Sequence, residues 1–146
     1  MPKRQEIGRK KFDRDVQTIR TKFPQWVYLD SPLTSTDWDG DSFSTTAKTL
    51  VDIHADFGVP AGVRAVLLRV IVRDSASAAN DCYLIISPNN NANEGFRVRC
   101  SGRPNDYWED QCLTVPCTAT GKFYYQIVAS GAGTLDAYIQ VWGYAI

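Results

Sequence analysis

Short segments in which apolar and polar residues alternate dominate the chain after Pro24 and constrain its fold more than any other feature. Alternation with a period of two places successive side chains on opposite faces of a strand, so each segment predicts an antiparallel strand with one buried face. About eight such segments occur, separated by runs rich in Gly, Pro, Asn, Asp and Ser. We therefore expect an all-β antiparallel β-sandwich over residues 24–146, of jelly-roll or immunoglobulin-like type.

The expected strands are short and differ in how clearly their ends are marked. The last two are predicted to pair as a hairpin across Ser130–Thr134, and the second places His54 on its polar face. In the last strand Tyr138, Gln140, Trp142 and Tyr144 should share the face opposite the apolar residues. The eight segments are 26–29, 49–57, 63–73, 82–87, 96–100, 112–115, 123–128 and 135–144.

One pairing register can be derived from the sequence alone. The segments CYLIIS and FRVRC flank the turn-rich stretch SPNNNANEG, and pairing Leu84 with Val98 collects the apolar residues of both strands on one face. The same register sets Cys82 opposite Cys100, and directly opposed residues in a non-hydrogen-bonded pair come close enough for a bridge, so we expect a disulfide between them if the protein works outside the cell. Cys112 and Cys117 would then form a second bridge around LTVP. Free, mostly buried thiols remain the alternative for a protein in a reducing compartment.

The first 22 residues differ in charge from the rest of the chain. They contain eight basic and three acidic residues, whereas the remainder contains eight basic and thirteen acidic ones, so a net charge of zero conceals two opposite halves. Such asymmetry predicts a basic arm at 1–23 that contacts something, joined to a body that folds without it.

The arm also has an apolar side. Helical spacing places four residues on one face of a helix of about three turns that ends before Pro24. So short a helix needs tertiary packing, either on a partner subunit or on one end of its own sandwich. A partner protein can contact both the basic and the apolar face of the arm, whereas the phosphates of a nucleic acid would contact the basic face alone. Nucleic-acid binding is therefore disfavoured. The apolar face comprises Phe12, Val16, Ile19 and Phe23, and the basic residues largely off that face are Lys10, Lys11, Arg14 and Arg20.

Length and hydropathy limit the number of domains and the cellular compartments in which the chain can be expected. A chain of 146 residues corresponds to one domain with an appendage, and no apolar run reaches the roughly 18 residues of a membrane span. The basic N-terminus lacks the apolar core of a secretory signal, so synthesis in a cytoplasm is expected.

The residues that could carry chemistry do not form a recognisable catalytic set. His54 is the single histidine, no nucleophile elbow is present and the cysteine spacing does not suit zinc, so we expect neither an enzyme nor a cofactor. Asp37, Asp39 and Asp41 offer a weak calcium alternative on an Asp-Gly turn. Trp38, Tyr107 and Trp108 lie in predicted loops and suggest an alternative function, in which the sandwich binds a carbohydrate or a host receptor through flat aromatic rings.

Four stretches resemble small β-sandwich structural proteins of tailed bacteriophages. They are WVYLDSPLTSTDWDGDSFST, FGVPAGVRAVLLRV, ISPNNNAN and ASGAGTLDAYIQVWGY. The resemblance implies a virion component of the capsid surface, neck or collar, tail or fibre, made in the host cytoplasm and assembled with other virion proteins. It also implies a closed homo-oligomer, a trimer or higher ring, whose cysteines could oxidise after assembly. It supplies no catalytic residues.

Overall fold

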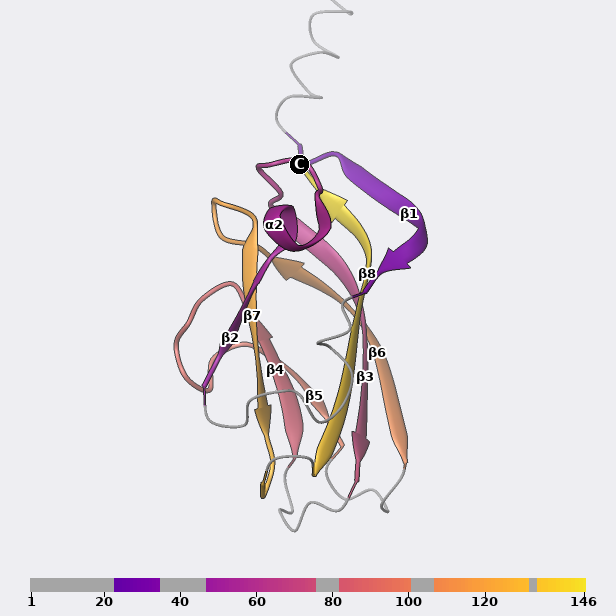
Figure 1. Ribbon diagram of the computed structural model, residues 1–146, viewed down its shortest axis with the longest axis vertical. Coiled ribbons are helices and arrows are strands. Elements are labelled where there is room, and N and C mark those ends of the chain that lie inside the picture. The colour runs from indigo at the N-terminus through magenta and orange to yellow at the C-terminus, as the bar shows by residue number, and fades with distance from the viewer. Residues whose placement is uncertain (1–22, 35–46, 76–81, 101–106, 132–133) are drawn as a thin grey trace, which may run out of the picture.

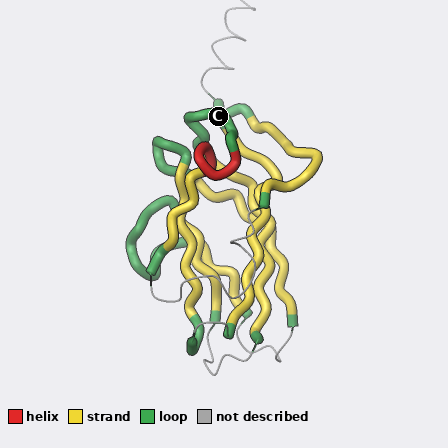
Figure 2. The backbone as a smooth tube through the Cα atoms, in the orientation of Figure 1, coloured by secondary structure: helices red, strands yellow, loops and turns green. Residues whose placement is uncertain are grey.

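The computed structural model describes residues 23–34, 47–75, 82–100, 107–131 and 134–146. These residues form eight strands and one single-turn helix (Figure 2). The helix is α2 (Ile53–Phe57), and it lies at the same end of the sandwich as the C-terminus. The strands are β1 (Trp26–Leu33), β2 (Thr49–Asp52), β3 (Ala65–Asp74), β4 (Tyr83–Ser87), β5 (Phe96–Arg99), β6 (Trp108–Pro116), β7 (Lys122–Val128) and β8 (Leu135–Ala145).

The strands form two four-stranded antiparallel sheets, ordered β1-β8-β3-β6 and β2-β7-β4-β5 (Figure 1). The first strand pairs with the last, the second with the seventh, the third with the sixth and the fourth with the fifth. A long hairpin bent between β4 and β5 and then rolled into two layers produces this order, which is that of a jelly roll. The predicted sandwich is therefore confirmed, and the strand order selects the jelly roll over the immunoglobulin-like alternative.

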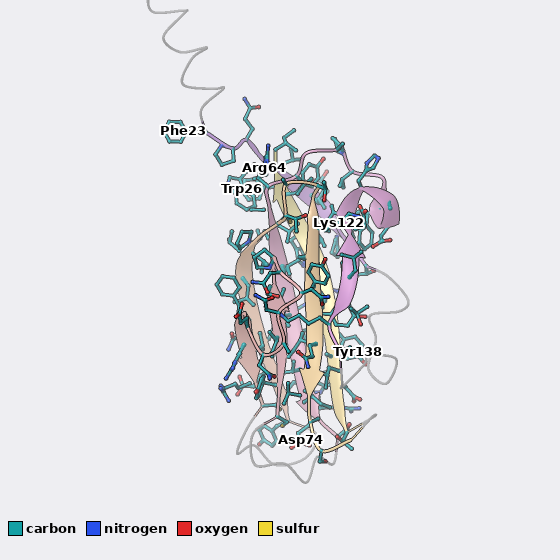
Figure 3. All side chains as sticks on the ribbon, turned by 90° about the vertical axis from the view of Figure 1, so that its left-hand side faces the viewer. Phe23, Trp26, Arg64, Asp74, Lys122 and Tyr138 are labelled. Carbon is teal, nitrogen blue, oxygen red and sulfur yellow. The ribbon has the colours of Figure 1, made fainter. Side chains whose placement is uncertain are left out.

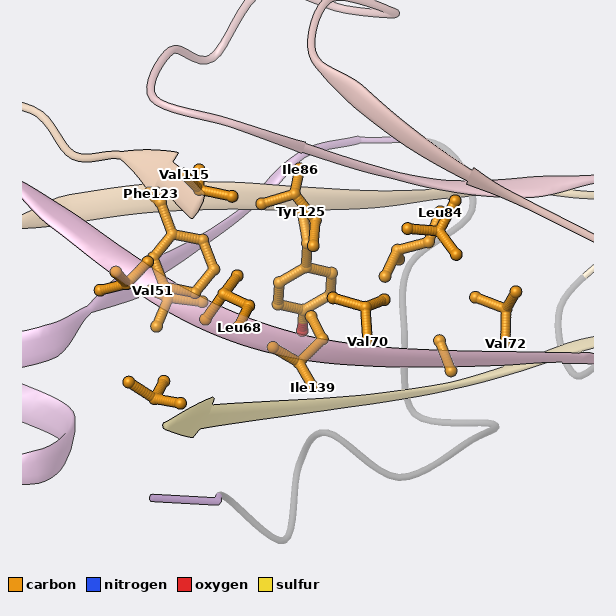
Figure 4. Packing of buried hydrophobic residues seen from close by; sticks show 14 of the residues in the cluster. Val51, Leu68, Val70, Val72, Leu84, Ile86, Val115, Phe123, Tyr125 and Ile139 are labelled. Atoms are coloured by element: carbon orange, nitrogen blue, oxygen red, sulfur yellow. The ribbon is translucent and has the colours of Figure 1, made fainter. Parts of the chain in front are cut away.

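The core fills the space between the two sheets (Figure 4). On β3 every second residue, from Val66 to Val72, is fully buried, which confirms the face predicted from alternation. Opposite it, β7 contributes Phe123 and β4 contributes Leu84, both fully buried. The inward residues of β8 are Leu135, Ala137, Ile139 and Val141, all buried as predicted.

The predicted register of β4 and β5 is confirmed. Leu84 pairs with Val98 and Ile86 with Phe96. Phe96, however, is 43% exposed, so the apolar face of this pair is not buried to its end.

The predicted final hairpin is wrong. β7 pairs with β2 and β4, whereas β8 pairs with β1 and β3 in the other sheet. Among the eight described strands, only β4 and β5 are both consecutive and paired. Two alternating strands in sequence satisfy the hairpin pattern equally well when the chain crosses between layers, because both still bury one face.

The predicted strand over 49–57 is half correct. β2 ends at Asp52, whose carboxylate accepts hydrogen bonds from the backbone N–H groups of His54 (3.2 Å) and Ala55 (3.1 Å) and so caps α2. Gly58 ends the helix in the left-handed region at φ +68°. The N-cap Asp52 and the C-cap Gly58 thus favour a helix where the alternation predicts a strand, and His54 is therefore a helical residue.

Three strand boundaries also differ from prediction. β1 continues through Pro32, which is tolerated because β1 is an edge strand. β6 begins at Trp108, within the stretch predicted as a loop. In β8 the register shifts opposite Leu67 and Leu68, and this bulge turns Tyr144 inward, where it is 8% exposed. Tyr144 therefore does not share a face with Tyr138, contrary to prediction.

Candidate binding surface

The outer face of the sheet β1-β8-β3-β6 presents aromatic and charged side chains. The register places Ile71 of β3 between Asp110 of β6 and Tyr138 of β8, and Arg73 between Trp108 and Asp136. Because strand side chains alternate, all of these point away from the core.

Four of these residues, together with Arg69, line a hollow. It has a volume of about 350 Å³ and is lined by Arg69, Ile71, Trp108, Asp110 and Tyr138. The rings of Trp108 and Tyr138 come from strands on either side of β3, yet their centroids are 5.5 Å apart with an interplanar angle of 44°. Trp108 is 47% exposed, so much of its ring remains open to solvent.

Two ion pairs order the charged groups around the hollow. Arg69 donates from Nε (2.9 Å) and Nη2 (2.5 Å) to the same oxygen, Oδ2 of Asp110. Arg73 donates from Nε to Oδ2 of the buried Asp136 at 2.7 Å, and its guanidinium carbon lies 4.8 Å from the centre of the Trp108 ring. Arg73 therefore fixes the indole through a cation–π contact while Asp136 fixes Arg73.

The carbohydrate residues predicted from the sequence are only partly brought together. Trp108 lines the hollow, whereas Tyr107 precedes β6, is 58% exposed and is not a lining residue. Trp38 and the calcium candidates Asp37, Asp39 and Asp41 lie outside the described residues, as do the arm residues before Phe23. The sequence reasoning missed Tyr138, Arg69 and Asp110 as site residues. The alternation in the last strand predicts that Tyr138 faces outward, but the closeness of its ring to Trp108 depends on the strand order.

Neither predicted disulfide is formed in the structure, where all four cysteines are free thiols. Cys100 N–H donates to the carbonyl of Cys82 at 3.0 Å, so the two residues are opposed as predicted but at a hydrogen-bonded position. Their sulfurs turn elsewhere: Cys82 Sγ donates to Asp74 Oδ2 at 3.7 Å, and Cys100 Sγ lies 3.5 Å from the carbonyl oxygen of Tyr107.

The second bridge fails for a different reason. Cys112 lies within β6 and Cys117 directly follows it, so the predicted LTVP loop is extended strand. The five residue steps from Cys112 to Cys117 separate the two Cα atoms by about 16 Å in an extended chain, far beyond the reach of a disulfide.

The thiols should differ sharply in reactivity. Cys112 is exposed, whereas burial raises the pKa of Cys82 and of Cys117 from 9.0 to about 11 and Cys100 is fully buried. We expect Ellman's reagent at pH 8 to modify one thiol of the native chain rapidly and all four in denaturant. Cys112→Ser should remove the rapid phase. Two or more rapid thiols in the native chain would contradict this assignment.

The same two shifts predict a loss of stability in alkali. A thiol whose folded pKa is raised binds its proton more tightly in the folded state, so its contribution is complete below about pH 9. The free energy of unfolding should fall as pH rises from about 9 to about 11. Urea titrations across this range would measure it, and Cys117→Ala should reduce the pH dependence.

The remaining groups do not form a further reactive site within the described ranges. His54 is exposed and its Nδ1 lies 2.6 Å from the carbonyl oxygen of Val59. No cluster of three His, Cys, Asp or Glu residues suited to a metal ion occurs among the described residues. The helix in that part of the chain is too short to cross a membrane.

Comparison with known proteins identifies no family. No protein-family model matches the chain, and no curated protein matches it. Seven chains among the solved structures match it. One is the coat protein of Tobacco streak virus, which is 6% identical, has a TM-score of 0.49 and aligns over 84% of this chain and 86% of its own.

Proposed function

We propose that this chain is a structural protein of a tailed-phage particle, which docks to a neighbouring subunit through residues 1–23. It would serve at the capsid surface, neck or collar, tail or fibre, assembled with copies of itself and with other virion proteins. The four stretches that resemble phage structural proteins support this proposal. So does the strand order, since viral capsid subunits are among the proteins that use the jelly roll. The proposal assigns no reaction, cofactor or metal to the chain.

The main structural support for the proposal is a group of exposed apolar side chains at one end of the sandwich. The start of the described chain meets the C-terminus there: Gln25 and Ile146 exchange two backbone hydrogen bonds of 2.9 and 3.1 Å. Three apolar side chains are exposed at or near this end, Phe23 at 67%, Tyr28 at 71% and Ile146 at 43%. Figure 3 shows Phe23 pointing away from the strands.

Phe23 is the last residue of the apolar stripe predicted for the arm. Its exposure favours docking onto a partner over packing against its own sandwich, the alternative that the sequence left open. Exposed apolar side chains grouped at one end are typical of surfaces that a neighbouring molecule buries. The basic residues of the arm would add attraction to an acidic neighbour.

Deleting residues 1–22 should abolish incorporation into particles and leave the sandwich folded. The reason is that the strands and core described here all lie after residue 22. Particles would be produced with the full-length or the shortened chain and the bound chain quantified, while circular dichroism and thermal melting report folding.

Two matched variants separate the arm's apolar and basic faces. Replacing Phe12, Val16 and Ile19 with serine keeps every charge and should abolish incorporation. Replacing Lys10, Lys11 and Arg14 with glutamine keeps the stripe and should weaken incorporation mainly at low salt. Normal incorporation of the shortened chain would refute docking through the arm.

A further inference from the structure

We propose that the hollow on the outer face of β1-β8-β3-β6 binds one pyranose unit of a glycan, stacked on Trp108 and hydrogen-bonded by Arg69 and Asp110. This binding function is additional to the structural role proposed above and uses a different part of the molecule. The site comprises Ile71 of β3, Trp108 and Asp110 of β6, Tyr138 of β8 and Arg69 of β3.

The aromatic part of the site is held in place without a ligand. The indole of Trp108 contacts the tilted ring of Tyr138 and the guanidinium of Arg73, which is in turn paired with Asp136. Side chains already fixed lose little conformational entropy on binding. The C–H face of a pyranose ring is apolar and flat enough to lie on such a ring, and Ile71 adds an aliphatic surface beside it.

The polar part of the site suits hydroxyl groups. Both hydrogen bonds from Arg69 go to Oδ2 of Asp110, and neither Asp110 Oδ1 nor Arg69 Nη1 has a hydrogen bond to another described residue. The two side chains are 41% and 44% exposed, so both can be reached. One hydroxyl can donate to Oδ1 while its neighbour on the sugar ring accepts from Nη1, since a hydroxyl does both.

A pyranose fits this hollow better than a second copy of the chain. The volume of about 350 Å³ lies at the lower end of the range for small-ligand sites, roughly 300–1,000 Å³. Stable protein interfaces bury roughly 800 Å² on each partner and are depleted of charge at their centre. This hollow is instead lined by the charged pair Arg69 and Asp110, and Arg73 lies over the Trp108 ring. An apolar partner would desolvate those charges without satisfying them, whereas sugar hydroxyls replace the lost water.

Titration of the full-length chain with defined sugars tests the proposal. The probes are the methyl pyranosides of glucose, galactose, mannose and N-acetylglucosamine, and an array of bacterial surface oligosaccharides. NMR would follow the Trp108 indole N–H and the Ile71 methyl groups. We expect at least one probe to shift both signals saturably, with millimolar affinity for a single sugar unit.

Variants show whether the shifts arise from the hollow. Trp108→Ala should weaken binding at least tenfold, and Asp110→Asn should weaken it less. Trp108→Phe keeps a flat ring and should retain part of the affinity, which covers the case in which Trp108→Ala fails to fold. Tyr107→Ala is the matched control: it removes the neighbouring, more exposed aromatic ring and should leave the affinity unchanged.

The proposal would be overturned by any of three results. The first is the absence of a response to every probe, and the second is that Trp108→Phe and Asp110→Asn each bind as tightly as the wild type. The third is that the Trp108 signals depend on protein concentration and not on sugar. The last would identify a self-association face. Each outcome is independent of particle incorporation, so failure here and failure of the docking arm are distinguishable.

Discussion

Phe123→Ala is expected to lower the free energy of unfolding by about 3–5 kcal/mol. Among the described residues Phe123 is the largest fully buried side chain, with no exposed surface, and it lies in β7 opposite Val51 of β2 (Figure 4). Both sheets pack around it, so neither can collapse fully into the cavity that alanine would leave. Urea denaturation monitored by tryptophan fluorescence measures the change.

Phe96→Ala is the matched control for this change. It removes the same atoms from the same sheet, but Phe96 is 43% exposed on the edge strand β5. We expect a loss of about 1 kcal/mol or less, as for a partly exposed site. Equal losses in the two variants would contradict the close packing of the core around Phe123.

Gly95→Ala should cost about 2–5 kcal/mol by combining backbone strain with overpacking. Gly95 has φ +139°, and a Cβ there would lie 2.5 Å from the carbonyl oxygen of Ile86 and 2.8 Å from Cβ of Ser87. The loop between β4 and β5 cannot move away freely, because Lys48 Nζ donates to the carbonyl oxygens of Asn89 (3.2 Å) and Glu94 (2.5 Å).

Gly62→Ala separates strain from crowding. Gly62 has φ +92°, but a Cβ there would meet nothing within 4 Å. Its expected cost is about 1–2 kcal/mol, from the positive φ alone. Thermal or urea unfolding of both variants gives the comparison, and a Gly95→Ala protein no less stable than Gly62→Ala would contradict the close packing of this loop.

Local pattern was enough to predict the strands that bury one clean face. In β8 the residues from Leu135 to Val141 alternate, and the face predicted to be apolar is buried. In β3 the apolar residues Leu67 and Ile71 interrupt the alternation, yet the face from Val66 to Val72 is fully buried as expected. The register of Leu84 with Val98 was also predictable, because a single turn-rich stretch joins the two strands and one alignment gathers their apolar residues.

Features that depend on which strands become neighbours were not predictable in this way. Alternation gives each strand a buried face but does not distinguish a hairpin from a crossover between layers, so β7 and β8 were paired incorrectly. The Asp52 cap ends the alternation of β2 and begins a helix, and the bulge in β8 turns Tyr144 inward, so each ends a strand pattern within a few residues. Cys82 and Cys100 were placed correctly, but whether an opposed pair is hydrogen-bonded depends on the phase of the ladder.

The candidate binding surface shows the same limit. The sequence predicts Trp108 to be a loop aromatic, yet it belongs to β6 and contacts Tyr138 only because β6 and β8 flank β3. Tyr138 and Trp108 are 30 positions apart in the sequence, and no local signal joins them. The polar pair Arg69 and Asp110 likewise meets across two strands.

The most direct test of the proposed virion role is a cryo-electron microscopy reconstruction of purified particles, with the chain identified by mass spectrometry. We expect density for an eight-stranded jelly roll whose Phe23 end, with Ile146 beside it, is buried against a neighbouring subunit that residues 1–22 also contact. Particles that lack the chain, or that present the Phe23 end of every copy to solvent, would contradict it.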